Sequence, residues 1–135
     1  MFIKIVNTPI RPDEVIAQAK SPDSGCVATY VGLIRDNSHG KRVQSVEYQD
    51  TDQQAEKHLE ALAEDILKKF PVNNLALCHR IGQLNVGDIN IVFAFGCSHR
   101  QEGFAACAYA VDRFKETLPT RKIETYQDGT TCSEW

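Results

Sequence analysis

Apolar residues recur along the chain in two periods, one close to two and one close to three and a half. Runs rich in β-branched and aromatic residues, bounded by turn-forming residues, are typical of strands. The run over residues 89–95 is almost entirely apolar, which predicts a strand in the centre of a sheet. The strands are predicted over residues 2–6, 25–35, 42–49, 75–82 and 88–98, with a last one starting at Arg121.

Spacings of three and four between apolar residues predict three helices, over residues 12–19, 51–70 and 101–118. Pro12 favours the start of the first helix, because proline loses no hydrogen bond in a first turn. Pro119 ends the third helix, because it lacks an N–H group and clashes with the preceding turn. Strands often follow one another directly, so the fold class is α+β with a mixed, largely antiparallel sheet. No linker or repeat divides the chain, which predicts a single domain over residues 1–135.

Composition excludes several classes of function. The chain has 15 basic and 18 acidic side chains, so it lacks the positive field that non-specific binding of nucleic acid requires. No apolar run approaches the roughly 18 residues that cross a bilayer, and the N-terminal segment does not resemble a signal peptide. Five cysteines, an odd number without a repeating spacing, fit reduced thiols. We therefore expect a cytoplasmic protein that binds neither nucleic acid nor membrane.

Two His-Arg pairs stand at or near the ends of predicted strands. His99-Arg100 also precedes a helix, where backbone N–H groups and the arginine fork suit an anion and His99 suits an acid or a base. In the alternative interpretation, Ser98 caps the helix, His99 bonds locally and Arg100 is solvated. His79-Arg80 lies inside a strand, and a structural role is the stronger expectation there.

Candidate binding motifs of the usual kinds are missing from the sequence. Cys78 with His79 and Cys97 with His99 lack the CxxC spacing of structural zinc sites, so no metal site is predicted. No glycine-rich phosphate loop occurs either, so any anion would be bound by side chains. The basic candidates are Arg35, Lys41, Arg42, Arg100, Lys115, Arg121 and Lys122.

Two lysines flank the proline that ends the third helix. Lys115 follows Phe114 in the last full turn, beside the apolar stripe, and Lys122 begins the next strand. Because Pro119 fixes the junction, both ammonium groups can converge on one pocket. A lysine that is partly desolvated or close to other cations becomes a better base or nucleophile. Taken singly, each lysine also fits a solvated surface charge.

Three segments together resemble the large, catalytic subunit of molybdopterin synthase. They are "YVGLIRDNSHGKRVQSVEYQ", "LALCHRIGQLNVGDINIVFAFGCSHRQEGFAACAYAVDRFKETLP" and "RKIE", in order between Tyr30 and Glu124. The resemblance implies an α/β hammerhead fold and a sulfurtransferase of molybdenum cofactor biosynthesis, which converts cyclic pyranopterin monophosphate (precursor Z) to molybdopterin. It also implies a small ubiquitin-like partner subunit with a C-terminal Gly-Gly thiocarboxylate, and a homodimer at the centre of a heterotetramer. No metal or organic cofactor is implied for the transfer.

The resemblance also assigns roles to individual residues. The implied catalytic residues are Lys122, Lys115 and His99, and the expected substrate-binding residues are Arg35, Arg100 and Arg121. Thr120 and Arg121 stand where the family usually has an aromatic residue and a tryptophan, which adds a cation beside Lys122. Two other functions remain open, namely a non-catalytic dimeric module that binds an anionic metabolite, and a scaffold that binds the partner without turnover.

Overall fold

A computed structural model describes residues 1–134 of the protein. The first of its two sheets has four strands in the order β1-β5-β7-β2. These strands are β1 (Phe2–Val6), β5 (Asn74–Arg80), β7 (Ile89–Cys97) and β2 (Cys26–Leu33). β1 pairs with β5 in parallel, and the other two pairings are antiparallel. The nearly all-apolar strand β7 therefore lies inside the sheet, as its sequence predicts.

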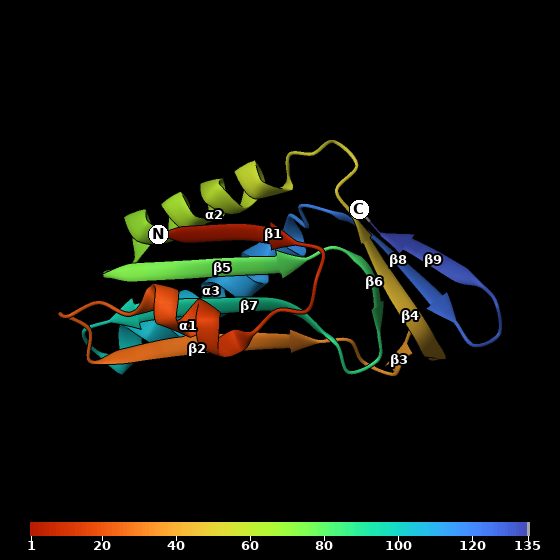
Figure 1. Cartoon of the computed structure of the whole chain (residues 1–135), viewed down its shortest axis with the longest axis horizontal. Helices are drawn as coiled ribbons and strands as arrows, with labels where there is room; N and C mark the ends of the chain where they lie inside the picture. Colours follow the sequence, from red (N-terminus) through yellow and green to blue (C-terminus); the bar gives the residue numbers. More distant parts are fainter. Residues whose placement is uncertain (135) are drawn as a thin grey trace.

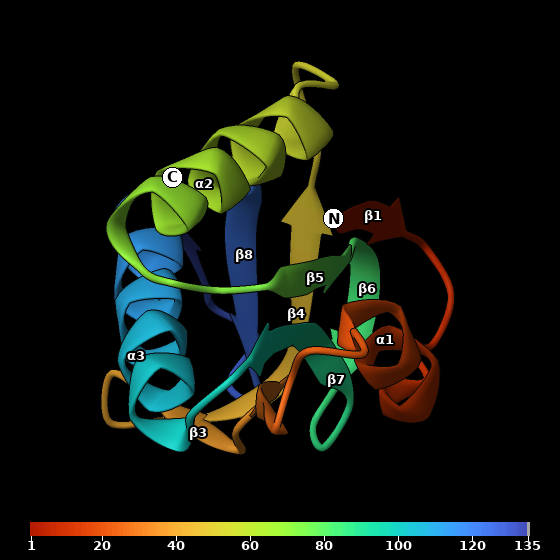
Figure 2. The ribbon, with the colours of Figure 1, turned by 90° about the vertical axis from the view of Figure 1, so that its left-hand side faces the viewer.

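Helices cover both faces of this sheet (Figures 1 and 2). α2 (Ala55–Lys69) and α3 (Arg100–Glu116) pack on one face, and α1 (Pro12–Ala19) packs on the other. Along β7, Phe93 and Phe95 point to the face with two helices, while Ala94 points to the shorter helix. At Gly96 a β-carbon would collide with the carbonyl oxygen of Ala19, so glycine is what allows α1 to approach so closely.

A second sheet lies beside the first, on the right in Figure 1. Its strands are β3 (Asn37–Ser38), β4 (Lys41–Gln49), β8 (Arg121–Tyr126) and β9 (Thr131–Glu134) in that order, with β6 (Gly82–Asn85) also paired to β4. All its pairings are antiparallel. A separate small core holds this sheet together, made by Ile34, Val43, Val46, Tyr48, Leu84 and Tyr126.

The architecture confirms the predicted α+β class with three helices and a mixed, largely antiparallel sheet. Three short strands, β3, β6 and β9, were not predicted. The predicted strand over residues 75–82 ends at Arg80, because Gly82 has a φ of 93° and redirects the chain into the second sheet. The segment between the predicted strands 25–35 and 42–49 folds into the tight β3–β4 hairpin.

Two general features of the described residues concern membrane-spanning helices and cysteine pairing. Within residues 1–134, no helix is both long and apolar enough to span a membrane. The five cysteines all carry free thiols.

Candidate active site

A cleft of about 570 Å³ opens where the two sheets meet, at the end of β2, the end of α3 and the beginning of β8. Arg35, Lys115 and Lys122 all line it. Arg35 lies in the loop after β2, Lys115 in the last turn of α3 and Lys122 at the start of β8. The fold therefore brings together side chains that the sequence separates by up to 87 positions. The expected convergence of the two lysines is present in a single chain.

Packing around the end of α3 sets the position of both lysines. Phe114 is buried against Phe93, with ring centroids 5.4 Å apart, which leaves Lys115 at the exposed edge of the helix beside the cleft. Pro119 and Thr120 are buried in the turn that follows. Lys122 then enters β8 opposite Tyr48 of β4, with 27% of its side chain exposed.

Successive side chains of β8 point to opposite faces of the sheet, and this separates two of the predicted site residues. Lys122 and Glu124 face the cleft. Arg121 is exposed and does not line the cleft, and its Nε donates a hydrogen bond to the Ser133 hydroxyl at 2.9 Å. The structure therefore does not bring the guanidinium of Arg121 to the ammonium group of Lys122.

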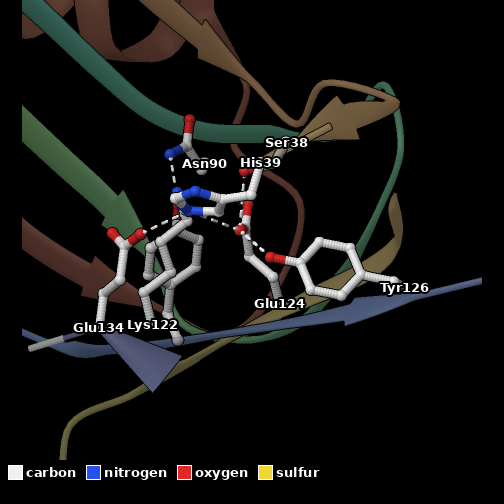
Figure 3. Close-up of polar contacts among 8 residues, drawn as sticks. Ser38, His39, Asn90, Lys122, Glu124, Tyr126 and Glu134 are labelled. Carbon is white, nitrogen blue, oxygen red and sulfur yellow. Dashed lines mark hydrogen bonds and ion pairs between the residues drawn. The ribbon is translucent and has the colours of Figure 1, made fainter. Parts of the chain in front are cut away.

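A buried carboxylate stands beside Lys122 (Figure 3). Glu124 accepts hydrogen bonds from Ser38 Oγ at 2.8 Å and Tyr126 Oη at 2.9 Å, and its Oε2 lies 3.7 Å from Lys122 Nζ. Burial by itself would raise the pKa of Glu124, but the two hydrogen bonds and the nearby cations outweigh it, and the pKa is lowered. Glu124 is therefore ionised at neutral pH and holds Lys122 by charge.

His79 lies behind the cleft and is fully buried. Its Nδ1 is 3.0 Å from the carbonyl oxygen of Asn90, which only accepts, so Nδ1 carries the proton. Nε2 is then the acceptor for the Thr120 hydroxyl at 2.9 Å. Burial lowers the pKa of His79 to about 4, so the ring is neutral at neutral pH. The structural role expected for His79 is what its contacts indicate, and Thr120 is its partner.

Tyr48 contributes a polar wall to the cleft. Its hydroxyl accepts a hydrogen bond from Asn90 Nδ2 at 3.0 Å, and its ring meets the ring of His79 edge-on at 5.0 Å. Burial raises the pKa of Tyr48 to about 12, although the bond from Asn90 opposes this shift. The cleft therefore presents a neutral phenol to any ligand.

His99 and Arg100 lie elsewhere, in a separate hollow of about 460 Å³. Arg100 begins α3 and Lys115 ends it, so 15 residues at 1.5 Å each place their backbones about 22 Å apart. Ser98 is not the helix cap. Its hydroxyl bonds to the carbonyl of Asp23 at 3.3 Å, and His99 occupies the cap position without a side-chain capping bond. One chain thus brings together three of the six predicted site residues.

The model of the MoaE protein family matches residues 5–117, which is well over half of the chain. The chain belongs to the MoaE protein family. A curated MoaE-type relative from Nostoc sp. (strain PCC 7120 / SAG 25.82 / UTEX 2576), named "Molybdopterin synthase catalytic subunit", is 40% identical over 132 residues, covering 97% of this chain and 79% of the relative.

Solved structures agree with this MoaE membership. The crystal structure of molybdopterin synthase from Staphylococcus aureus has a TM-score of 0.90 and 28% identity, with 98% of this chain and 96% of that chain covered. A chain in the complex of subunits 1 and 2 of molybdopterin-converting factor from Helicobacter pylori has a TM-score of 0.73 and 16% identity, over 93% and 85% of the chains, and shares the fold. The predicted family and its role as an enzyme of molybdopterin synthesis are confirmed.

Sequence reasoning missed several polar residues in and beside this MoaE-family cleft. Glu124 carried a usable signal, because it stands two positions after Lys122 in a predicted strand and so shares its face. Asn90 and Tyr48 carried none, since their polar atoms meet only through the pairing of distant strands. His39 and Glu134, which lie near Glu124 in Figure 3, come from a hairpin and a strand that were not predicted.

Proposed function

We propose that this cleft transfers sulfur from the C-terminal thiocarboxylate of a small ubiquitin-like subunit to cyclic pyranopterin monophosphate, which forms the dithiolene of molybdopterin. The observation that carries the proposal is the convergence of Arg35, Lys115 and Lys122 on one cleft in a MoaE-family chain. Both proposed reactants are anions, and three cations from three separate segments of the chain suit them.

The roles follow from charge and position. Lys122 is half-buried and tethered by Glu124, so its ammonium group is preorganised to neutralise the thiocarboxylate and the oxyanion that forms when the thiocarboxylate carbon is attacked. Lys115 supplies a second positive charge from the helix end. Arg35 offers a planar fork for two phosphate oxygens. Arg121 is not part of this proposed set, because it points away from the cleft.

The small ubiquitin-like subunit would insert its C-terminal thiocarboxylate into the cleft. The Helicobacter pylori structure is a complex of subunits 1 and 2 of molybdopterin-converting factor. One of its chains shares the fold of this chain, which supports an equivalent pairing here. The free thiols of all five cysteines support the cytoplasm as the location.

We infer that His99 and Arg100 act from a second copy of the chain. α3 is a single helix with Arg100 at one end and Lys115 at the other, so no movement within it brings them together. In a two-fold homodimer, the hollow of one copy can face the cleft of the other. Arg100 would then help bind the phosphate and His99 would move protons in the partner's cleft, within the heterotetramer that the family resemblance implies.

Replacement of Lys122 by alanine tests the sulfur transfer. Purified chain, thiocarboxylated small subunit and precursor are mixed, and the dithiolene product is followed. We expect a loss of at least about a hundredfold in rate for Lys122→Ala, the usual effect of removing a group that stabilises an oxyanion. Lys57→Ala on the exposed face of α2 is the matched control. Near-normal turnover by a folded Lys122→Ala protein would refute the catalytic proposal.

Mixed dimers test the shared site. Lys122→Ala and Arg100→Ala chains are inactive by themselves in this scheme, but a mixed dimer contains one site with both residues intact. We therefore expect activity to return when the two variants are unfolded together and refolded. If both residues served the same copy's cleft, every site would carry one defect and no activity would return.

A further inference from the structure

A second group of reactive side chains lies at the outer rim of the cleft. His39, Cys132 and Glu134 each offer one potential ligand atom, and these atoms lie within 4.8 Å of one another. His39 Nε2 and Glu134 Oε1 are 3.2 Å apart. The sulfur transfer proposed above uses none of the three.

The β3–β4 hairpin holds the histidine over the sheet. Ser38 and Lys41 pair, which leaves a two-residue turn of His39 and Gly40 with φ values of 53° and 75°. Two successive positive φ values define a type I′ turn, in which asparagine, aspartate or glycine is the usual first residue. Histidine tolerates this conformation better than most residues do, and here its ring lies against β8 and β9 (Figure 3).

Strand pairing places the other two residues on the same face. Cys132 is paired with Glu124, and Glu134 is paired with Lys122. Directly opposite residues of antiparallel strands project to one side, so Cys132 and Glu134 share the face that carries the Lys122–Glu124 ion pair. The register of a single β-hairpin therefore sets a thiol and a carboxylate two positions apart beneath the imidazole.

We propose that His39, Cys132 and Glu134 bind one zinc ion. Imidazole nitrogen, thiolate and carboxylate oxygen are the three ligand types that zinc takes in proteins. In a tetrahedral site with zinc–nitrogen and zinc–oxygen distances of about 2.0–2.1 Å, those two ligand atoms stand about 3.3 Å apart. The observed 3.2 Å between His39 Nε2 and Glu134 Oε1 matches one edge of that tetrahedron.

The remaining ligands and charges also fit the ion. Glu124 Oε1 lies 3.8 Å from His39 Nε2, so either this buried carboxylate or a water can fill the fourth position. Zinc binding would convert the Cys132 thiol to a thiolate and release its proton to solvent. The ligands of the divalent cation would then include a thiolate and one or two carboxylates, depending on whether water or Glu124 fills the fourth position.

Without a metal, the contact between His39 and Glu134 adds little stability. Their side chains are 58% and 45% exposed, and an exposed ion pair of this kind contributes about 0–1 kcal/mol. A bound zinc ion would instead join β9, the last strand of the second sheet, to the β3–β4 hairpin at the other side of that sheet. It would fix the rim of the cleft next to Lys122 without entering the transfer reaction.

Zinc titration of the full chain tests this site. The protein is prepared without a polyhistidine tag, stripped with a chelator, and titrated calorimetrically with zinc. We expect one zinc per chain in the wild type. Since loss of a residue that only supports a ligand weakens metal affinity by about 10–100-fold, His39→Ala and Cys132→Ser should each weaken it at least tenfold.

Cobalt(II) provides a second, spectroscopic readout. The wild-type complex should show a near-ultraviolet thiolate-to-cobalt charge-transfer band, and Cys132→Ser should abolish it. His58→Ala on α2 and Cys107→Ala on α3 are matched controls that should keep both the band and the zinc affinity. Absence of stoichiometric zinc binding, or unchanged affinity in Cys132→Ser with its cooperative unfolding intact, would overturn the proposal. Neither outcome affects the test of Lys122, so the two ideas fail separately.

Discussion

Acidification should destabilise the protein through His79, well above the pH at which its carboxylates titrate. Burial lowers the pKa of this histidine from 6.5 to about 4. Because the folded-state pKa lies below the unfolded-state value, the unfolded chain binds a proton more readily between these two pH values. The stability contributed by neutral His79 is therefore complete above pH 6.5 and is lost as the pH falls towards 4.

The magnitude follows from the size of the pKa shift. Between pH 6.5 and pH 5, one and a half pH units at about 1.4 kcal/mol each give a loss of about 2 kcal/mol in the free energy of unfolding. The pKa values of Glu124, Asp65 and Asp128 are lowered from starting values of 4.5 or less, so these groups add to the acid sensitivity only below pH 5. Protonation of His79 also forces Nε2 to become a donor, which reverses its bond with Thr120.

Urea unfolding at pH 7 and pH 5, at one fixed chain concentration, measures the effect. His79→Gln removes the titrating ring, so its stability should change about 2 kcal/mol less than that of the wild type between the two pH values. His58→Gln is the matched loss of an exposed imidazole. If His79→Gln fails to fold, NMR titration of His79 in the wild type gives the same information. A pH dependence equal in wild type and His79→Gln, or a measured pKa near 6.5, would refute the reasoning.

Two further predictions concern the stability of the fold, one through a buried hydrogen bond and one through close packing. Thr120→Val keeps the shape of the side chain but leaves His79 Nε2 buried without its donor, and should lower the free energy of unfolding by about 1–3 kcal/mol in urea titrations. An unchanged stability would show that the bond is weak. Gly96→Ala should cost about 1–3 kcal/mol in the same assay, because the added methyl collides with the backbone of α1 at Ala19. Wild-type stability of that variant would mean that α1 is not held so tightly.

The sequence predicted the elements that have a strong period or a clear stop. Pro12 and Pro119 marked the start of α1 and the end of α3, and the apolar run of β7 marked the centre of the first sheet. Short strands lacked such a signal. β3 has two residues and β9 has four, too few for a period to be read, and both exist because the second sheet offers them partners.

The candidate site was predictable in part. The lysines converge because Pro119 couples the end of a helix to the start of a strand, which is a local feature. The direction of Arg121 depends on which face of β8 meets the cleft, and this is set by pairing with β4 some 70 residues earlier. The separation of Arg100 from Lys115 could have been predicted from the sequence, since a helix predicted over residues 101–118 already implies a distance of about 22 Å between them.

α3 acts as a spacer of fixed length and fixed rotational phase between the hollow at its beginning and the cleft at its end. A single residue inserted in its middle would lengthen it by about 1.5 Å and turn one end relative to the other by about 100°. Lys115 would then leave the cleft even though every reactive side chain is still present. We therefore expect the chain to tolerate substitution along the exposed face of this helix far better than any change in its number of residues.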